Sequence, residues 1–286
     1  MSLFGTNYKF HTGYALSGGG AKGFAHLGAL NVLESKGLKP HVIAGTSAGA
    51  LAGVFYADGF HPDEIADLFT GKEFREFIGF SMPKQGFFKT SGLFHFLKKN
   101  LRARTFEDLQ IPFISVVTDW KRARTVSFYQ GNQLIESVIA SCSIPVFFQP
   151  QYIDGIPYVD GGLFKNLPVS VIREQCKYVI AINVNSLMPY CEDAGIKKMV
   201  ERTFNLMSNS NTLIDKKLCD ILIEMEGLDK FTIFDINNLK EIKKIGYETA
   251  SSKMDEPKSK HIIRRCLRHK ELESKINRWI NQTSLL

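Results

Sequence analysis

The sequence lacks features that mark several large classes of protein. No run of about 18 apolar residues occurs in its 286 residues, so a transmembrane helix is not expected. The five cysteines are odd in number and widely spaced, without a CxxC pair, which favours reduced thiols over a disulfide framework or a zinc site. The first residues, MSLFGTNYKFHTG, contain no apolar segment typical of a secretory signal. We therefore expect a cytoplasmic protein.

Apolar residues make up 44% of the sequence, enough for a large buried core. In the first two thirds, short apolar runs alternate with helical patterns, and the runs at 14–17, 41–45, 113–119, 125–129 and 178–185 predict strands. Uniformly apolar strands that alternate with helices indicate a mainly parallel sheet that is covered on both faces. The predicted fold is therefore α/β, a three-layer α/β/α sandwich with a mainly parallel central sheet.

After Asp193 the chain is more charged, and its pattern is mainly helical. The spacing predicts helices over 196–207 and 214–226 and a strand over 230–236. No linker composition separates this part from the rest. We therefore predict one domain over 1–286, with a core at about 12–185 and a helical C-terminal layer at about 186–286.

Gly18, Gly20 and Gly23 follow the first predicted strand and precede a predicted helix. Their G-x-G-x-x-G spacing is that of a dinucleotide-binding turn, which also needs an acidic residue about 20 residues later, at the end of the second strand. No Asp or Glu occurs at 40–57. A P-loop is excluded too, because no lysine follows the third glycine. These glycines must therefore shape a turn for another purpose.

The second predicted strand ends in GTSAG, which places Ser47 between Gly45 and Gly49. G-x-S-x-G between a strand and a helix is typical of a sharp turn that exposes a serine Oγ above the sheet. The helix that follows directs its first N–H groups and the positive end of its dipole toward the same point. The sequence therefore predicts Ser47 as a nucleophile.

An acyl-transfer serine needs N–H groups directed at the developing oxyanion. Ala48, the residue after the serine, would supply one. Gly18, Gly19 and Gly20 lie in the turn of the neighbouring predicted strand and can direct N–H groups inward without a side chain in the way. The alternative is a tight turn without chemistry, and its coincidence with Ser47 argues against that.

The serine also needs a proton acceptor. His26, about one turn beyond Gly23, is a candidate, although a packed helix histidine is the plainer interpretation. Asp160 precedes Gly161 and Gly162 in apolar surroundings, where desolvation would make it a stronger base than a free Asp, whose pKa is about 3.9. An ordinary Asp-Gly β-turn is the alternative at this position.

Three blocks, GGGAKG, GTSAG and DGG, together resemble the patatin-like phospholipases, a family of lipid acyl hydrolases. SCSIPVFFQP at 141–150 and DGGLFKNLPV at 160–169 are similar to the family's sequence around its Asp-Gly-Gly block. The resemblance covers about 12–185. It implies a Ser-Asp dyad without histidine and ester hydrolysis through an acyl-enzyme, with no metal or other cofactor, and the sequence shows no metal-ligand spacing.

Carried over to this chain, the resemblance makes Ser47 the nucleophile and Asp160 its general base. It implies an oxyanion hole formed by Gly18, Gly19, Gly20, Ala21 and Ala48. The supporting positions of the three blocks are Lys22, Gly23, Gly45, Gly49, Gly161 and Gly162. Lys22 stands where the family has Arg or Lys, and it would set the turn or the local field rather than act in catalysis.

The stretch 77–106 contains no Asp or Glu, and its six basic residues alternate with phenylalanines. We predict a cap that admits acyl chains and contacts anionic head groups at a membrane surface; the alternative is a core-packed segment with a cationic outer face. The basic region from Lys253 onward has apolar residues at helical spacing, which favours a docked amphipathic helix over a membrane anchor. Neither region contains a nucleic-acid module, so no nucleic-acid partner is expected.

The leading hypothesis is a serine hydrolase, similar to a phospholipase A or lysophospholipase, that cleaves fatty-acyl esters of phospholipids or other lipids. Within the same class, the alternative is a small-ester carboxylesterase or thioesterase. From another class, it is a non-catalytic lipid-binding regulator on the same fold. The presence of both Ser47 and Asp160 counts against the regulator.

Overall fold

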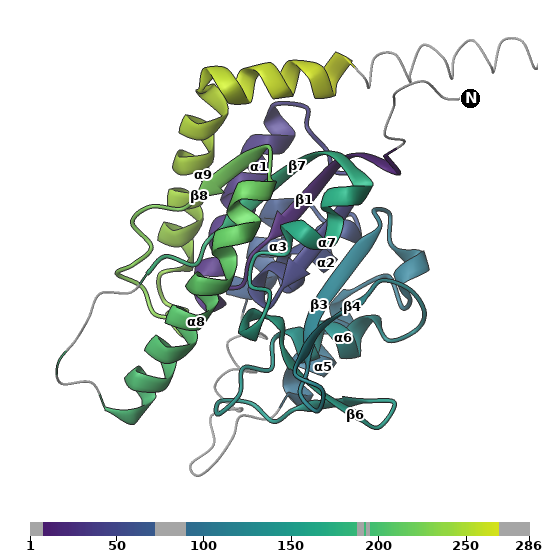
Figure 1. The fold of residues 1–286 in the computed structure, drawn as a ribbon, viewed down its shortest axis with the longest axis vertical. Helices are drawn as coiled ribbons and strands as arrows, with labels where there is room; N and C mark the ends of the chain where they lie inside the picture. The colour runs from purple at the N-terminus through teal and green to yellow at the C-terminus, as the bar shows by residue number, and fades with distance from the viewer. Residues whose placement is uncertain (1–7, 72–89, 188–191, 193–194, 269–286) are drawn as a thin grey trace, which may run out of the picture.

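The computed structural model describes residues 8–71, 90–187, 192 and 195–268, and Figure 1 shows their arrangement around a central sheet. Its strands are β1 Phe10–Leu16, β2 Val42–Thr46, β3 Phe113–Asp119, β4 Arg124–Phe128, β5 Gln151–Ile153, β6 Ile156–Asp160, β7 Cys176–Asn183 and β8 Ile221–Glu224. Its helices are α1 Phe24–Ser35, α2 Ala48–Ala57, α3 Pro62–Thr70, α5 Ser91–Asn100, α6 Leu134–Ser141, α7 Val169–Ile172, α8 Ile196–Leu218 and α9 Leu239–Asp255. Short 3₁₀ turns are η1 Gly20–Gly23, η2 Phe106–Asp108, η3 Gly161–Leu163 and η4 Arg173–Gln175.

The described strands form an eight-stranded sheet in the order β5-β6-β3-β2-β1-β7-β8, with β4 beside β3. β3, β2, β1, β7 and β8 are parallel, whereas β4, β5 and β6 join antiparallel. In the register of the central pair, Leu16 lies beside Gly45. The turns that follow β1 and β2 therefore lie next to each other at one edge of the sheet, which is where open α/β sheets bind ligands.

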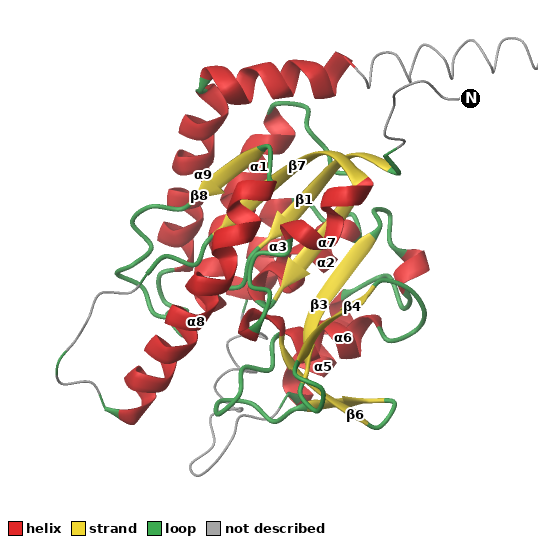
Figure 2. Ribbon diagram, viewed as in Figure 1, coloured by secondary structure: helices red, strands yellow, loops and turns green. Residues whose placement is uncertain are grey.

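Side-chain size alternates along the central strands and assigns the two faces of the sheet. Large side chains such as Leu16 and Ile43 are buried against α1, α2, α3, α6 and α9. The small side chains of Ala15, Ala44 and Ala181 face the opposite layer, which contains α7. Figure 2 shows α7 and α8 in front of the sheet with further helices behind it. The three-layer α/β/α prediction is thus confirmed.

The start of α3 illustrates how local chemistry sets an element. His61 Nδ1 accepts the Asp63 N–H at 3.3 Å, and the Glu64 carboxylate accepts the His61 N–H at 2.8 Å. This reciprocal capping box satisfies two of the N–H groups that a helix start leaves unpaired. Glu64, in the acidic first turn of α3, is therefore part of its cap.

The C-terminal part is mainly helical, but two of its predicted boundaries are wrong. The helix predicted over 214–226 ends with α8 at Leu218, and the chain continues as β8, paired in parallel with β7. The run at 230–236, predicted as a strand, forms turns instead. Its apolar character has another cause, because Ile233 and Phe234 line a cavity described below.

The two basic regions are described in part. In the predicted cap, 77–89 lies outside the described residues, and beyond it Phe96 and Phe106 are buried in the core while Lys98 and Lys99 are exposed. Residues 257–268 are helical and bury Ile262, Ile263 and Cys266, as predicted for a docked helix, while the rest of this basic region, 269–286, lies outside the described residues. None of the described helices combines the length and the apolar character that a bilayer crossing needs.

Candidate active site

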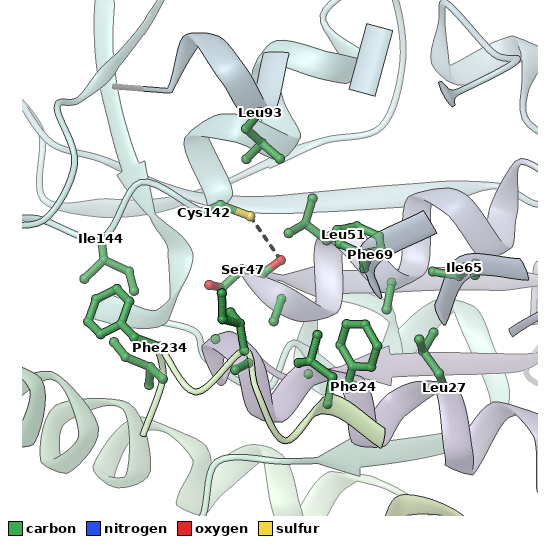
Figure 3. A pocket seen from close by; sticks show the side chains of 18 of the residues that line it. Phe24, Leu27, Ser47, Leu51, Ile65, Phe69, Leu93, Cys142, Ile144 and Phe234 are labelled. Atoms are coloured by element: carbon green, nitrogen blue, oxygen red, sulfur yellow. Dashed lines mark hydrogen bonds between the residues drawn. The ribbon is translucent and has the colours of Figure 1, made fainter. Parts of the chain in front are cut away.

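Ser47 lies at the junction of β2 and α2, as the sequence predicted, and is flanked by Gly45 and Gly49. Its backbone has φ 53° and ψ −122°, which a residue with a side chain rarely adopts. Its N–H donates to Ser141 Oγ at 2.8 Å, and its carbonyl accepts from Cys142 Sγ at 3.3 Å, the bond drawn in Figure 3. A strained strand-to-helix turn, here hydrogen-bonded to the neighbouring residues 141 and 142, is the geometry of a nucleophile elbow.

Glycines bring the elbow into contact with the turn after β1. A Cβ on Gly49 would lie 2.7 Å from the carbonyl oxygen of Ser17, so a side chain there would push α2 away from the end of β1. A Cβ on Gly23 would lie 2.5 Å from the Cβ of Ala48. The two turns that the sequence assigned to one site are thus packed against each other.

The predicted oxyanion-hole residues fall into two groups. The N–H groups of Gly18 and Ala21 are already donated, to Asn166 O at 3.1 Å and to Ile233 O at 2.8 Å. The second group consists of N–H groups without a hydrogen-bond acceptor among the described residues, those of Gly19, Gly20 and Ala48. Gly20 has φ 58°, which turns the chain at this point at no steric cost. The second group is the one whose donors remain for a ligand oxygen.

Asp160 ends β6 next to the elbow, and its side chain has no exposed surface. Its backbone is fixed by two bonds, from its N–H to Ser143 O at 3.0 Å and from Thr118 Oγ1 to its carbonyl at 3.0 Å. Its Oδ1 accepts the Gly162 N–H at 2.7 Å. Its Oδ2 is buried without a hydrogen-bond partner in the described part of the chain. Oδ1 is thus fixed by a backbone hydrogen bond, whereas Oδ2 remains available to accept a proton.

Burial raises the pKa of Asp160 to about 7. The nearby Ser47 hydroxyl and the Gly162 N–H favour the ionised form and lower the pKa, but they do not outweigh desolvation. Gly161 allows the chain after Asp160 to pack closely against β3, since a Cβ at this position would lie 2.9 Å from the carbonyl carbon of Val116. A carboxyl group with a pKa near neutrality is suited to accept a proton and return it.

His26 is fully buried, and its Nε2 donates to Ser17 O at 2.8 Å. Burial lowers its pKa to about 4, so the ring is neutral at neutral pH. Its bond holds the start of the glycine turn, which agrees with the interpretation as a packed helix histidine.

Lys22 is also fully buried, and its Nζ has no hydrogen-bond partner among the described residues. Burial lowers the pKa of Lys22, while Glu201 and Asp229 raise it.

A cavity of about 430 Å³ opens at Ser47. Figure 3 shows Ile144 and Phe234 on one side of the serine and Phe24, Leu27 and other apolar side chains on the other. Its lining comes mostly from apolar residues of α1, α2, α3 and the segments around 142–148 and 233–239. The size lies within the usual range of about 300–1,000 Å³ for ligand sites. The cavity can hold an apolar chain whose polar end lies at Ser47.

A second pocket adjoins Ser47 and has a volume of only about 10 Å³. It is lined by Gly19 and Gly20 of the glycine turn and by the buried side chains of Asn166 and Asn185. Neither amide Nδ2 has a hydrogen-bond partner within the described residues. A space of this size holds one water or one oxygen atom.

The described residues include no group of three or more His, Cys, Asp or Glu side chains able to hold a metal ion.

Three further residues belong to the site without having been predicted from sequence: Asn166, Ser141 and Cys142. All three lie in the blocks SCSIPVFFQP and DGGLFKNLPV, so a signal was present. Their contacts with the turns after β1 and β2 join residues far apart in the sequence. Spacing within one block does not reveal such contacts.

Comparison with known proteins finds a matching family and several relatives. The family model described as patatin-like phospholipase matches residues 14–172, more than half of the chain. An uncharacterized NTE family protein of Mycobacterium bovis is 30% identical over 175 residues, which cover 60% of this chain and 48% of that protein. The human patatin-like phospholipase domain-containing protein 6 is 30% identical over 185 residues, 60% of this chain and 13% of that protein. The chain thus spans half or less of the length of these relatives.

Among solved structures, VipD from Legionella pneumophila superposes with a TM-score of 0.51 and 16% sequence identity. The match covers 86% of this chain and 67% of that one. At this identity the likeness concerns the fold. It extends beyond the residues that the family model matches.

Proposed function

The chain belongs to the patatin-like phospholipase family, and from that premise we propose that it is a serine lipid acyl hydrolase that cleaves fatty-acyl esters through a Ser47-Asp160 dyad. One observation carries the proposal: a serine in a strained elbow lies at the polar end of an apolar cavity of about 430 Å³, beside a buried carboxyl group. An elbow serine suits acyl transfer, and the cavity suits a lipid chain.

In the first step, Ser47 Oγ attacks the acyl carbonyl carbon while the Asp160 carboxylate takes the hydroxyl proton. The oxyanion accepts hydrogen bonds from the N–H groups of Gly19, Gly20 and Ala48. The ester C–O bond then breaks, and the protonated Asp160 gives its proton to the departing alcohol. The acyl group remains on Ser47.

In the second step, water attacks the acyl-enzyme and Asp160 accepts its proton. The bond to Ser47 Oγ breaks, the fatty acid leaves, and the proton returns to the serine. Each proton passes through Asp160, so a pKa of about 7 serves both directions of transfer. The apolar cavity holds the acyl chain through both steps.

Hydrolysis of p-nitrophenyl esters, from acetyl to palmitoyl, tests the proposal. We expect the wild type to favour longer chains, Ser47→Ala to lose about 10⁴-fold or more in kcat, and Asp160→Asn to lose about 10²–10⁴-fold. Ser115→Ala is the matched control, because Ser115 is a fully buried serine whose Oγ has no partner in the described part of the chain. It should retain wild-type activity.

The other outcomes point to the alternatives. A preference for acetyl over longer esters would favour a small-ester carboxylesterase or thioesterase. A folded wild-type protein that is inactive on every ester would favour a non-catalytic lipid-binding regulator. Full activity of Asp160→Asn would refute the dyad and make His26 the next residue to substitute.

A further inference from the structure

Helix α8 has the opposite polarity from that expected of a helix on a protein surface. Six of its apolar side chains are between 36% and 82% exposed. They are Ile196, Met199, Leu206, Leu213, Ile214 and Leu218. At 100° per residue these six positions span less than half of the helix circumference, so they form one face, here called the outer face of α8. A surface helix normally turns such a face toward the core.

The buried face of α8 is polar instead, and its polar groups are engaged with the protein. Asn211 Nδ2 donates to Gly162 O at 2.8 Å. Asp215 accepts from Lys165 Nζ at 2.8 Å and from the Ser170 N–H at 2.6 Å. These bonds attach α8 to the segment that follows Asp160, from η3 to the start of α7. They also fix its rotation, because turning the outer face inward would leave buried polar groups unpaired.

The charges of α8 follow the same division. Its two acidic residues, Glu201 and Asp215, are both buried. Near opposite ends of the helix, Lys198 is exposed beside the apolar outer face and Lys217 is exposed within it. An apolar face flanked by basic side chains is typical of helices that lie in the plane of a membrane surface and attract anionic lipid.

The outer face also lies close to the candidate active site. Val200, at the edge of the outer face, and Phe204, on the adjoining flank of the helix, pack in a cluster with Ile144 and Ile233, which line the cavity at Ser47. The outer face therefore lies within one helix diameter, about 10 Å, of the cavity wall. Figure 1 shows α8 at the surface of the molecule, with its N-terminal half extending beyond the sheet.

From these observations we propose that the outer face of α8 binds the surface of a bilayer that contains anionic lipid, and that the protein takes its substrate from this surface. The proposal rests on the proposed lipid hydrolase function. A second copy of the chain fits the face less well. In a two-fold pair, parallel or antiparallel, the lysines at the ends of α8 would meet lysines of the partner, and like charges brought together at an interface disfavour it.

The test compares vesicles of phosphatidylcholine alone with vesicles that also contain phosphatidylserine, in a flotation assay. The wild type should bind the anionic vesicles, and the double variant Leu213→Glu/Ile214→Glu should bind at least about tenfold less, since two carboxylates replace apolar side chains. Lys198→Glu/Lys217→Glu should lose the preference for anionic vesicles. All four positions are exposed, so the variants should fold, which thermal unfolding checks.

Tyr152→Glu/Tyr247→Glu is the matched control, because both tyrosines are similarly exposed but lie on β5 and α9. It should bind vesicles as the wild type does. Activity is measured in parallel on vesicle phospholipid and on soluble p-nitrophenyl butyrate. The Leu213→Glu/Ile214→Glu variant should lose vesicle hydrolysis and keep butyrate hydrolysis.

Equal binding by the wild type and the Leu213→Glu/Ile214→Glu variant would overturn the proposal. So would a wild-type dimer that this variant converts to a monomer, because the outer face would then be an interface between copies. Absence of wild-type hydrolysis of every p-nitrophenyl ester from acetyl to palmitoyl would instead contradict the proposed function, and vesicle binding would still decide the role of α8.

Discussion

Two carboxylates at the ends of neighbouring strands differ in their partners. Asp119 ends β3 and lies opposite Tyr158, while Asp160 ends β6 and lies opposite Val117. Neither side chain has exposed surface. Asp119 accepts the Arg122 N–H at 2.9 Å and Arg122 Nη1 at 3.1 Å, whereas Asp160 accepts a single N–H among the described residues and no cation.

The pKa values follow the partners. Burial raises the pKa of Asp119, but the bonds from Arg122 and Lys121 outweigh it, so the pKa is lowered. Arg122 and Arg124, which cover Asp119, are themselves more than half exposed, so water lies close by. Burial raises the pKa of Asp160 to about 7 without a cation to oppose it. A raised pKa therefore depends on missing partners as well as on burial, and it marks a candidate site.

Of the changes that test the difference between Asp160 and Asp119, Asp160→Asn should have the largest effect, and the quantity to measure is the free energy of unfolding. The folded pKa of about 7 lies above the ordinary 3.8, so the folded state binds the proton more tightly than the unfolded chain. The carboxyl group therefore lowers the free energy of unfolding progressively as pH rises through this interval. Asparagine has no such cost, and the variant should be more stable than the wild type at pH 8 by on the order of 1–4 kcal/mol.

Urea unfolding at pH 5 and pH 8 measures this difference, which should be larger at pH 8. Asp119→Asn is the control with the opposite sign. The lowered pKa of Asp119 means that its ionised form stabilises the folded state above the ordinary pKa, so its loss should destabilise the protein at pH 8. If Asp160→Asn were less stable than the wild type at pH 8, the inferred difference between a raised pKa at Asp160 and a lowered pKa at Asp119 would be wrong.

The next effect concerns the pH dependence of activity. Asp160 must be ionised to accept the Ser47 proton, so kcat/KM should rise about tenfold per pH unit up to a pKa of about 7 and then level off. The profile of p-nitrophenyl butyrate hydrolysis between pH 5 and pH 9 measures this. Arg122→Ala, which removes a partner of Asp119 alone, should leave the profile in place. A flat profile from pH 5 upward would mean that the base has an ordinary carboxyl pKa.

The smallest effect concerns backbone strain beside each carboxylate. Ser47 next to Asp160 has φ 53°, and Ala123 in the hairpin after Asp119 has φ 50°. Glycine adopts such angles freely, so Ser47→Gly and Ala123→Gly should each raise the free energy of unfolding by about 0.5–1 kcal/mol. Ser47→Gly should be inactive and Ala123→Gly fully active.

Thermal unfolding of these two variants and of Ser47→Ala, which keeps the strain, measures the effect. Ser47→Gly should be the more stable of the two Ser47 variants. Equal stability of Ser47→Gly and Ser47→Ala would show that the elbow stores no strain.

The central fold could be predicted because its signals are local. The strand at 113–119 was identified from apolar runs, and Ser47 from a motif whose strand and helix were both visible. The strand at 221–224 was not, because ILIE has only four residues and extends a helical pattern. Its state is decided by pairing with β7, beside Asp220, whose carboxylate accepts the Val179 N–H at 2.7 Å.

The candidate site divides in the same way. Sequence by itself determined which residues are proposed to carry the chemistry, because Ser47, Asp160 and the glycine turn each lie in a recognisable block. The tertiary structure decided what those residues can do. It left Gly19 and Gly20 as donors while Gly18 and Ala21 were used, and it buried one carboxylate without a cation.

The tertiary structure alone also decided the orientation of α8 and the use of the run at 230–236. Both segments have a clear apolar pattern, but pattern does not say what an apolar face contacts. The polar face of α8 is attached to the loop after Asp160, which leaves its apolar face outward. Periodicity is set by neighbours within a few residues, whereas burial, pairing and pKa depend on groups that only the folded chain brings together.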